Sequence, residues 1–212
     1  MFPQTNHTMK TQPSSPNRRG FTLIELLVVI TIIVILAGLS MGGYGYIVRK
    51  QADSQAAIQI SLLSKALEEY KLDFGVYPGA EYKDSNGNVL GHYGGAAASN
   101  ADGLNSNVLY SALYEEGVEY SKTPGRSDPY GIKATKIYVS ALDPENDKQG
   151  WIDDTGNKVK IVDPFGAEYI YRLGVDAKAK NPDFDLLSRG KDGETDDSNP
   201  DASENRDDID NF

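Results

Sequence analysis

The sequence predicts an α+β protein in which one long N-terminal helix packs on a small antiparallel β-sheet head. Residues 26–47 form an uncharged, mostly apolar run, and residues 52–74 carry apolar or small side chains at helical spacing. Beyond Pro78 the chain changes to short strand-like runs separated by turn sequences. With 212 residues and 39% hydrophobic content, the chain has room for one anchor segment and one compact domain.

The first 20 residues form a polar segment that contains Lys10, Arg18 and Arg19 and no acidic residue. Apolar character begins abruptly at Phe21. Basic flanks of this kind stay on the cytoplasmic side of a membrane. A secretory signal peptide would have its cleavage site after the apolar run, whereas here the small and basic residues precede it. A plain signal anchor remains an alternative.

The apolar run has the length of a membrane span, because a helix needs about 20 residues to cross about 30 Å of hydrocarbon. We therefore expect three parts: a leader at residues 1–20, a transmembrane half of the N-terminal helix at residues 21–46, and a globular head at residues 47–212. The whole helix, from residue 21 to about residue 74, would be roughly 80 Å long.

Glu25 is a carboxylate placed inside the apolar stretch, where an unpaired charge costs about 2.5–3.5 kcal/mol. No cation lies close enough in the sequence to offset it. Cleavage after Gly20 would create an α-amino group at Phe21, and Glu25 of one subunit would pair with that amine in a neighbour. The simpler alternative is that Glu25 reaches the headgroups from near the helix start.

The residues RRG followed by FTLIELLVVITIIVILA resemble the class III signal of type IV pilins and pseudopilins, with Glu25 as fifth residue of the mature chain. The resemblance implies a type IV pilin-like fold. It also implies that a prepilin peptidase cleaves the Gly20–Phe21 bond at the inner membrane and methylates the new N-terminus.

The second half of the helix has one apolar face, with charged residues on the other face. That face is formed by Ala52, Ala56, Ile60, Leu63, Leu67, Tyr70 and Phe74. Gly38 and Gly42 have the small-xxx-small spacing that permits close helix contact in a membrane. It is equally consistent with the sequence that these glycines only end the spanning segment.

The head begins with a Gly-, Ala-, Ser- and Asn-rich stretch, residues 79–107, which we interpret as a variable surface loop with a small hairpin at residues 84–88. We expect a short helix over residues 108–116, with Asn105 or Asn107 as its cap. The remaining strand signals follow further along the chain.

A turn sequence at residues 154–157 lies between two apolar runs and predicts a hairpin. Residues 169–173 alternate in polarity and predict a further strand. Together these elements predict an antiparallel sheet of three or four strands.

The acidic segment, residues 183–212, holds 11 acidic and three basic residues and carries most of the chain's net charge of −10. The strings VDPFGAEYIYRL, FDLLSRGKDG and DDIDNF resemble signatures of the major pseudopilin of type II secretion systems. That resemblance implies a calcium site formed by Asp192, Asp207, Asp208 and the backbone carbonyl of Arg189. The chemistry agrees, because Ca²⁺ prefers six to eight oxygen ligands. The alternative is a solvated acidic tail.

Other functional classes have little support in the composition. The acidic balance argues against nucleic acid as a partner. The chain has no cysteine and only two histidines, so a thiolate site or a histidine-based catalytic site is not expected. An anchored, calcium-dependent hydrolase is kept as a weak alternative.

The resemblance implies a structural subunit of a type II secretion pseudopilus, anchored once in the bacterial inner membrane with its head in the periplasm. The implied partners are further copies of the chain, minor pseudopilins, the inner-membrane assembly platform and its ATPase, and prepilin peptidase. The alternative within the same group is a type IV pilin or minor pilin used for adhesion, motility or DNA uptake.

Overall fold

The computed structural model describes residues 20–95, 97, 105–147 and 149–212, without the side chains of residues 40–43. The residues of the predicted leader before Gly20 lie outside this range. The chain divides into two compact units, one that ends at Gly45 and a head unit, Tyr46–Phe212. The helix α1, Leu23–Phe74, contributes to both units.

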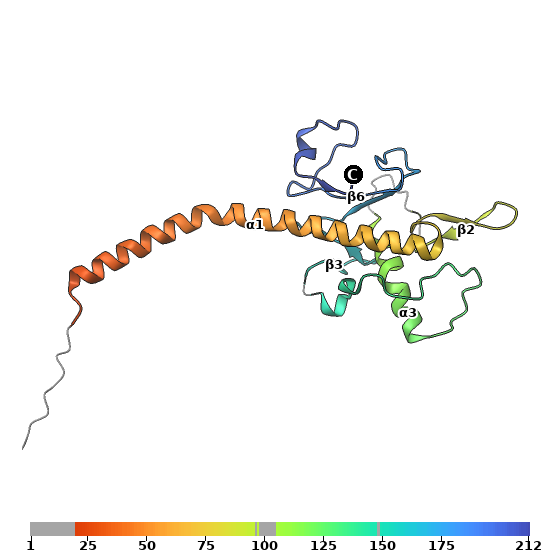
Figure 1. Cartoon of the computed structure of the whole chain (residues 1–212), viewed down its shortest axis with the longest axis horizontal. Helices are drawn as coiled ribbons and strands as arrows, with labels where there is room; N and C mark the ends of the chain where they lie inside the picture. The colour runs from red at the N-terminus through yellow and green to blue at the C-terminus, as the bar shows by residue number, and fades with distance from the viewer. Residues whose placement is uncertain (1–19, 96, 98–104, 148) are drawn as a thin grey trace, which may run out of the picture. The chain divides into compact units, whose positions relative to one another are not determined.

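The described elements after α1 are short (Figure 1). The helical ones are α2 (Ser106–Tyr110), a π-helix (Ser111–Glu115), α3 (Glu116–Lys122) and 3₁₀ turns at Ser140–Leu142, Pro144–Asn146 and Ser203–Arg206. The strands are β1 (Glu81–Lys83), β2 (Val89–His92), β3 (Ile152–Asp153), β4 (Lys160–Ile161), β5 (Ile170–Leu173), β6 (Phe184–Ser188) and β7 (Ile209–Asp210). A long N-terminal helix followed by short antiparallel strands confirms the predicted α+β class.

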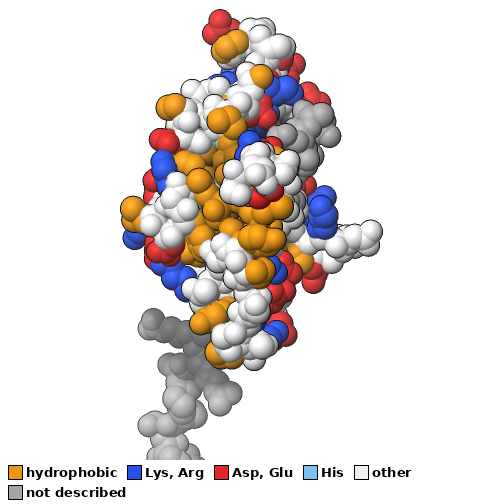
Figure 2. Space-filling view, turned by 90° about the vertical axis from the view of Figure 1, so that its right-hand side faces the viewer, with side chains coloured by type: hydrophobic (Ala, Val, Ile, Leu, Met, Phe, Trp, Pro, Cys, Tyr) orange, Lys and Arg blue, Asp and Glu red, His pale blue; other side chains and the backbone are white. Residues whose placement is uncertain are grey.

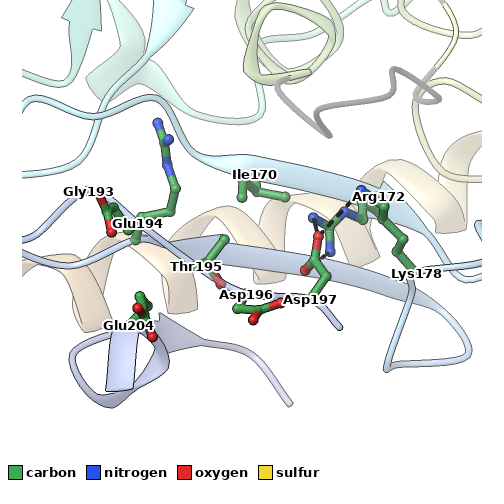
Figure 3. A pocket seen from close by; sticks show the side chains of 10 residues that line it. Ile170, Arg172, Lys178, Gly193, Glu194, Thr195, Asp196, Asp197 and Glu204 are labelled. Carbon is green, nitrogen blue, oxygen red and sulfur yellow. Dashed lines mark hydrogen bonds and ion pairs between the residues drawn. The ribbon is translucent and has the colours of Figure 1, made fainter. Parts of the chain in front are cut away.

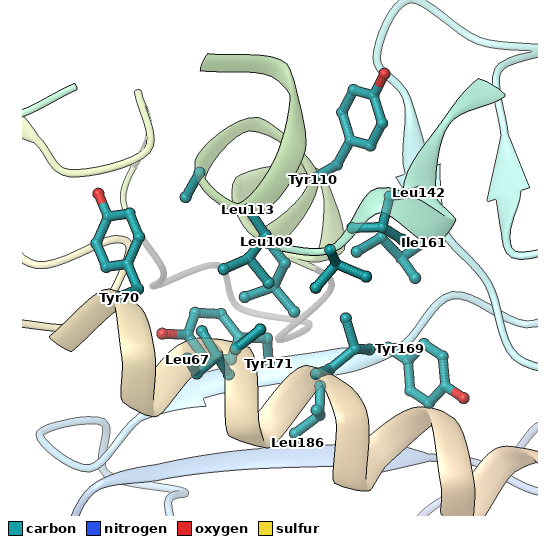
Figure 4. Close-up of a cluster of buried hydrophobic side chains, with 14 of the residues drawn as sticks. Leu67, Tyr70, Leu109, Tyr110, Leu113, Leu142, Ile161, Tyr169, Tyr171 and Leu186 are labelled. Atoms are coloured by element: carbon teal, nitrogen blue, oxygen red, sulfur yellow. The ribbon is translucent and has the colours of Figure 1, made fainter. Parts of the chain in front are cut away.

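The second half of α1 buries the predicted apolar face within the head unit. Ala56, Ile60, Leu63, Leu67 and Tyr70 are all buried, whereas the ends of the stripe are partly exposed. All of these except Ala56 pack against side chains from α2, the π-helix and the strands, as Figure 4 shows for the cluster around Leu67, Leu109 and Tyr171. Burial of each such side chain contributes about 1.5–3 kcal/mol, so this stripe attaches the helix to the head.

The strands form three small antiparallel sheets among the described residues, not the single sheet of three or four strands that the sequence predicts. β1 pairs with β2, β3 with β4, and β6 lies between β5 and β7. The predicted hairpins and the strand near residues 169–173 are confirmed. The prediction missed β6 and β7, because both belong to the acidic segment.

The predicted helix over residues 108–116 is present but extends from Ser106 to Lys122 and widens at its centre into a π-helix. The carbonyl of Leu113 accepts hydrogen bonds from the amides of both Tyr138 and Val139. Asn105 occupies the N-cap position, but its side chain donates to the carbonyl of Tyr171 and makes no capping bond. Residues far along the chain therefore contact both the start and the widened turn of this helix.

The turn at residues 84–88 is an aspartate-organised turn, as expected. The Asp84 carboxylate accepts from the amides of Asn86 and Asn88 and from the side-chain amide of Asn88. These bonds explain why an acidic residue stands at this position.

The apolar core reaches the surface at one face of the structure. Figure 2 shows this face, on the right of Figure 1, with hydrophobic side chains gathered near its middle and charged side chains around them. A groove of about 910 Å³ is formed by the end of α1, the β1–β2 hairpin and the turn between β5 and β6, with Tyr77, Ala80, Leu173 and Val175 among its lining residues.

Candidate functional site

The predicted cleavage bond lies just before α1. Gly20 and Phe21 are both exposed, and an added Cβ at Gly20 would meet no atom of the described residues within 4 Å. The bond between them therefore lies outside regular structure and outside the packed core, where a peptidase can reach it.

Glu25 has a partner that the sequence analysis missed. Its carboxylate accepts from the amide of Thr22 at 2.8 Å and from the Thr22 hydroxyl at 3.0 Å, while the Thr22 hydroxyl accepts from the amide of Glu25 at 3.3 Å. This reciprocal arrangement is a capping box, and the spacing T-x-x-E before an apolar run is its sequence signal. Glu25 therefore stabilises the start of α1 within its own chain.

The surface of α1 up to Leu39 is apolar and uncovered. The large hydrophobic side chains described from Phe21 to Leu39 are each at least 49% exposed. Among the described residues no single helix qualifies as a membrane span, although the bent pair Leu23–Leu39 and Tyr44–Phe74 qualifies together. Continuous apolar surface of this extent requires a lipid or protein environment to cover it.

The acidic segment is folded against the head and is not a free tail. Strand β6 is completely buried, and β7 pairs with its end through Leu187–Asp210 and Ser188–Ile209. The Ser188 hydroxyl donates to Asp163 at 2.6 Å, and Asp163 also organises the turn of the DPFG string through the amides of Phe165 and Ala167. The strings VDPFGAEYIYRL and FDLLSRGKDG thus meet in space.

Within the acidic segment, the backbones of Gly190 and Asp207 approach each other closely. Gly190 has φ +59°, and a Cβ there would lie 2.2 Å from the carbonyl oxygen of Asp207. The Asp207 carboxylate accepts from the amides of Lys191 and Asp192, at 2.8 and 3.3 Å. Glycine at position 190 is required for both reasons, its left-handed backbone and the absence of a side chain.

Asp208 has an unsatisfied carboxylate oxygen. Its Oδ2 accepts from the Thr195 hydroxyl at 2.7 Å, whereas Oδ1 is buried and has no hydrogen-bond partner among the described residues. Burial raises the pKa of the Asp208 carboxyl above its ordinary value; the Thr195 hydrogen bond opposes this shift, and the charges of Asp207 and Asp192 add to it. A buried acceptor without a donor is a place where a cation or a proton is favourable.

Asp197, in the stretch between Asp192 and Asp207, is paired with a residue of strand β5. Arg172, which is 2% exposed at its side chain, donates to both oxygens of Asp197 at 2.9 and 2.7 Å (Figure 3). Asn205 bonds both the amide and the carbonyl of Asp196. A cavity of about 560 Å³ lies beside this ion pair. Sequence reasoning missed the pair because its members are 25 residues apart.

The four predicted metal-binding positions lie in one region, but their carboxylates do not converge. Among the residues that the structure describes, no group of three or more His, Cys, Asp or Glu side chains is arranged to hold a metal ion. Asp192 accepts instead from the amide of Glu194 at 2.9 Å. Asp208 is the one of the four with a free buried oxygen.

Comparison with known proteins gives one family match and two similar relatives. Residues 15–41 match the family model described as the prokaryotic N-terminal methylation motif. The chain is 42% identical over 73 residues to the type II secretion system core protein G of Pectobacterium carotovorum, an alignment of 32% of this chain and 44% of the relative. It is 43% identical over 70 residues to the core protein G of Escherichia coli K12, covering 31% and 45%.

The chain therefore spans less than half the length of these curated relatives. No solved structure matches the chain.

Proposed function

We propose that this chain, a type IV pilin-like protein related to the core protein G of type II secretion, is a structural subunit of a type II secretion pseudopilus. In this role it has no catalytic activity. It is inserted once in the bacterial inner membrane, processed at its N-terminus and polymerised with further copies of itself. Minor pseudopilins, the assembly platform and its ATPase are the other proposed partners.

The observation that carries this proposal is the coincidence of the methylation motif with the similarity to two core G proteins. The exposed apolar surface of α1 supports it, because a subunit that leaves the membrane for a filament must exchange lipid contacts for contacts with other helices.

The N-terminal geometry suggests how assembly is selected. Hydrolysis of the Gly20–Phe21 bond leaves a carboxylate on Gly20 and an ammonium on Phe21. Glu25 is held at the start of the helix by Thr22 in the isolated chain. In the filament, the carboxylate would exchange these neutral donors for the ammonium of a neighbouring subunit, and this ion pair is stronger in an apolar environment than in water.

We also infer that the acidic segment binds Ca²⁺ through Asp208, Asp207, Asp192 and the carbonyl of Arg189. The unsatisfied Asp208 oxygen and its raised pKa support this inference, since a divalent cation would neutralise neighbouring carboxylates that otherwise repel. Bound calcium would supply a structural link that stabilises the head of a protein without disulfides. Because these carboxylates do not converge in the described structure, binding requires them to turn inward.

The decisive experiment is co-expression of the full chain with a prepilin peptidase, followed by mass spectrometry of the N-terminus and electron microscopy of sheared filaments. We expect a mature chain that begins with N-methylated Phe21. Gly20→Val should block cleavage, whereas the control Gly38→Ala, which lies within α1, should be cleaved normally.

Glu25→Gln keeps the size of the side chain and removes its charge. We expect this variant to be cleaved and to be lost from filaments. A protein that is never cut at Gly20 would contradict the proposal and favour an anchored enzyme. A cleaved protein that forms long surface fibres without any effect on secretion would instead indicate a type IV pilin.

A further inference from the structure

An ion pair connects the acidic segment to α1 at the beginning of the head unit. Arg49 Nη2 lies 3.6 Å from Asp207 Oδ2. The Arg49 side chain is 47% exposed and the Asp207 side chain only 16%, so Asp207 is the more strongly shielded from water of the two charged groups. Asp207 therefore depends on nearby donors for its solvation.

The same carboxylate oxygen already accepts two backbone hydrogen bonds, from Lys191 and Asp192. At 3.6 Å the guanidinium adds charge and not a well-formed hydrogen bond. Its contribution is therefore electrostatic. It offsets the negative charge of Asp207, whose carboxylate contacts the backbone of Asp192 and which is followed in the chain by Asp208.

We propose that Arg49 is a built-in counter-cation of the acidic segment and competes with a divalent cation for Asp207. In the metal-free chain it compensates the carboxylate and keeps the segment folded against α1. A cation that binds Asp207 and Asp208 is repelled by the guanidinium, and its binding in turn weakens the hold of Arg49 by the same factor. This inference rests on the proposed calcium site and concerns its regulation.

The competition gives calcium binding a consequence for the helix. Arg49 lies three residues after Tyr46, where the head unit begins. Binding of calcium to the acidic segment thus frees the Arg49 side chain from Asp207. Arg49 lies close in the chain to the predicted transmembrane half of the helix, residues 21–46. An increase in the mobility of the Arg49 side chain on calcium binding is the structural signature of this competition.

The sign of one affinity change separates competition from a merely structural role. If Arg49 only positioned Asp207, its removal would weaken calcium binding. If Arg49 competes, its removal strengthens binding, by about three- to tenfold at low ionic strength, with a smaller gain at high salt. The test is calcium titration of the full chain in detergent micelles by isothermal calorimetry, at low salt and at about 0.5 M salt.

Three variants make the comparison specific. Arg49→Gln should bind Ca²⁺ more tightly than the wild type, and Arg49→Lys, which keeps the charge, should stay within about twofold of it. Lys50→Gln removes the same charge from the adjacent helix position and measures the general effect of net charge. We expect its gain to be clearly smaller than that of Arg49→Gln.

A thermal melt in chelator gives an independent readout of the same competition. Arg49→Gln should lower the midpoint by about 1–3 °C without calcium and show no deficit with calcium in excess. Weaker calcium binding by Arg49→Gln, or a gain equal to that of Lys50→Gln, would overturn the competition and leave the calcium site intact. Absence of calcium binding by the wild type up to about 10 mM, well above the Kd of extracellular calcium modules, would overturn both.

Discussion

Carboxylates near the two ends of the described chain are held by different kinds of partner, local at one end and distant in sequence at the other. Glu25 is held by Thr22, three residues away, on the exposed first turn of α1. Asp197 and Asp207 are held by Arg172 and Arg49, which belong to other elements of the head unit. The difference teaches that the N-terminal end works through local sequence, whereas the C-terminal end works only after the head has folded.

The largest effect expected from this comparison is at Gly190. Gly190→Ala should destabilise the head by about 4 kcal/mol, because a Cβ must be accommodated against the backbone of Asp207 in a left-handed conformation. Gly193→Ala is the matched control: its φ is +71°, but nothing lies within 4 Å, so about 1 kcal/mol is expected. Urea unfolding followed by the fluorescence of Trp151, the single and buried tryptophan, measures both.

Equal losses for the two glycine variants would mean that the contact between residues 190 and 207 is loose. The acidic segment would then not depend on a tight contact between residues distant in sequence, and in this respect it would not differ from the start of α1.

The next effect concerns the buried ion pair. Arg172→Ala should cost about 3 kcal/mol, since it leaves Asp197 without its bidentate partner. Lys178→Ala removes the second, exposed cation near the same carboxylate, 3.6 Å away, and should cost less than about 0.5 kcal/mol. The same fluorescence assay ranks them. Similar losses would show that Arg172 contributes no more than a surface charge.

Calcium should stabilise the folded head by about 2.7 kcal/mol when present at about one hundred times its dissociation constant. We expect Asp208→Asn to lose this gain, and Asp210→Asn, on the exposed end of β7, to keep it. The difference between unfolding midpoints in calcium and in chelator is the measurement. If Asp208→Asn is still stabilised by calcium as much as the wild type, Asp208 is not a calcium ligand.

Removal of the cap should have a small and local effect. Thr22→Ala should cost about 1 kcal/mol of helix stability and fray the first turn of α1. Hydrogen exchange at residues 23–26 should accelerate while the unfolding midpoint of the head stays unchanged. A shift of that midpoint would mean that the two ends are not independent.

The smallest expected effect is a slope of stability with pH in chelator. The pKa of Asp208 is raised in the folded state, so its contribution is present at low pH and is lost as pH rises through the folded pKa. Asp208→Asn should flatten the dependence of the unfolding free energy on pH just above the ordinary range of aspartate. If the dependence of the unfolding free energy on pH is unchanged in Asp208→Asn, a group other than Asp208 causes it.

The long helix, its buried stripe and both tight hairpins could be predicted because helical spacing and turn residues act over a few positions. The capping box is equally predictable from T-x-x-E, because this pattern spans only four consecutive residues. The strand β6 was missed because acidic neighbours made its buried residues look like part of a solvated run. The division into three small sheets was missed because strand signals do not specify which strands pair.

For this protein, the sequence alone determined the α+β class, the apolar helix with its processing motif, and the concentration of acid near the C-terminus. Only the tertiary structure decided that Gly190 must admit the backbone of Asp207, that Arg172 binds Asp197, and that Arg49 faces Asp207. The physical reason is range. Periodicity, capping and charge density are properties of neighbouring residues, whereas burial, close approach and ion pairing depend on which distant segments the core brings together.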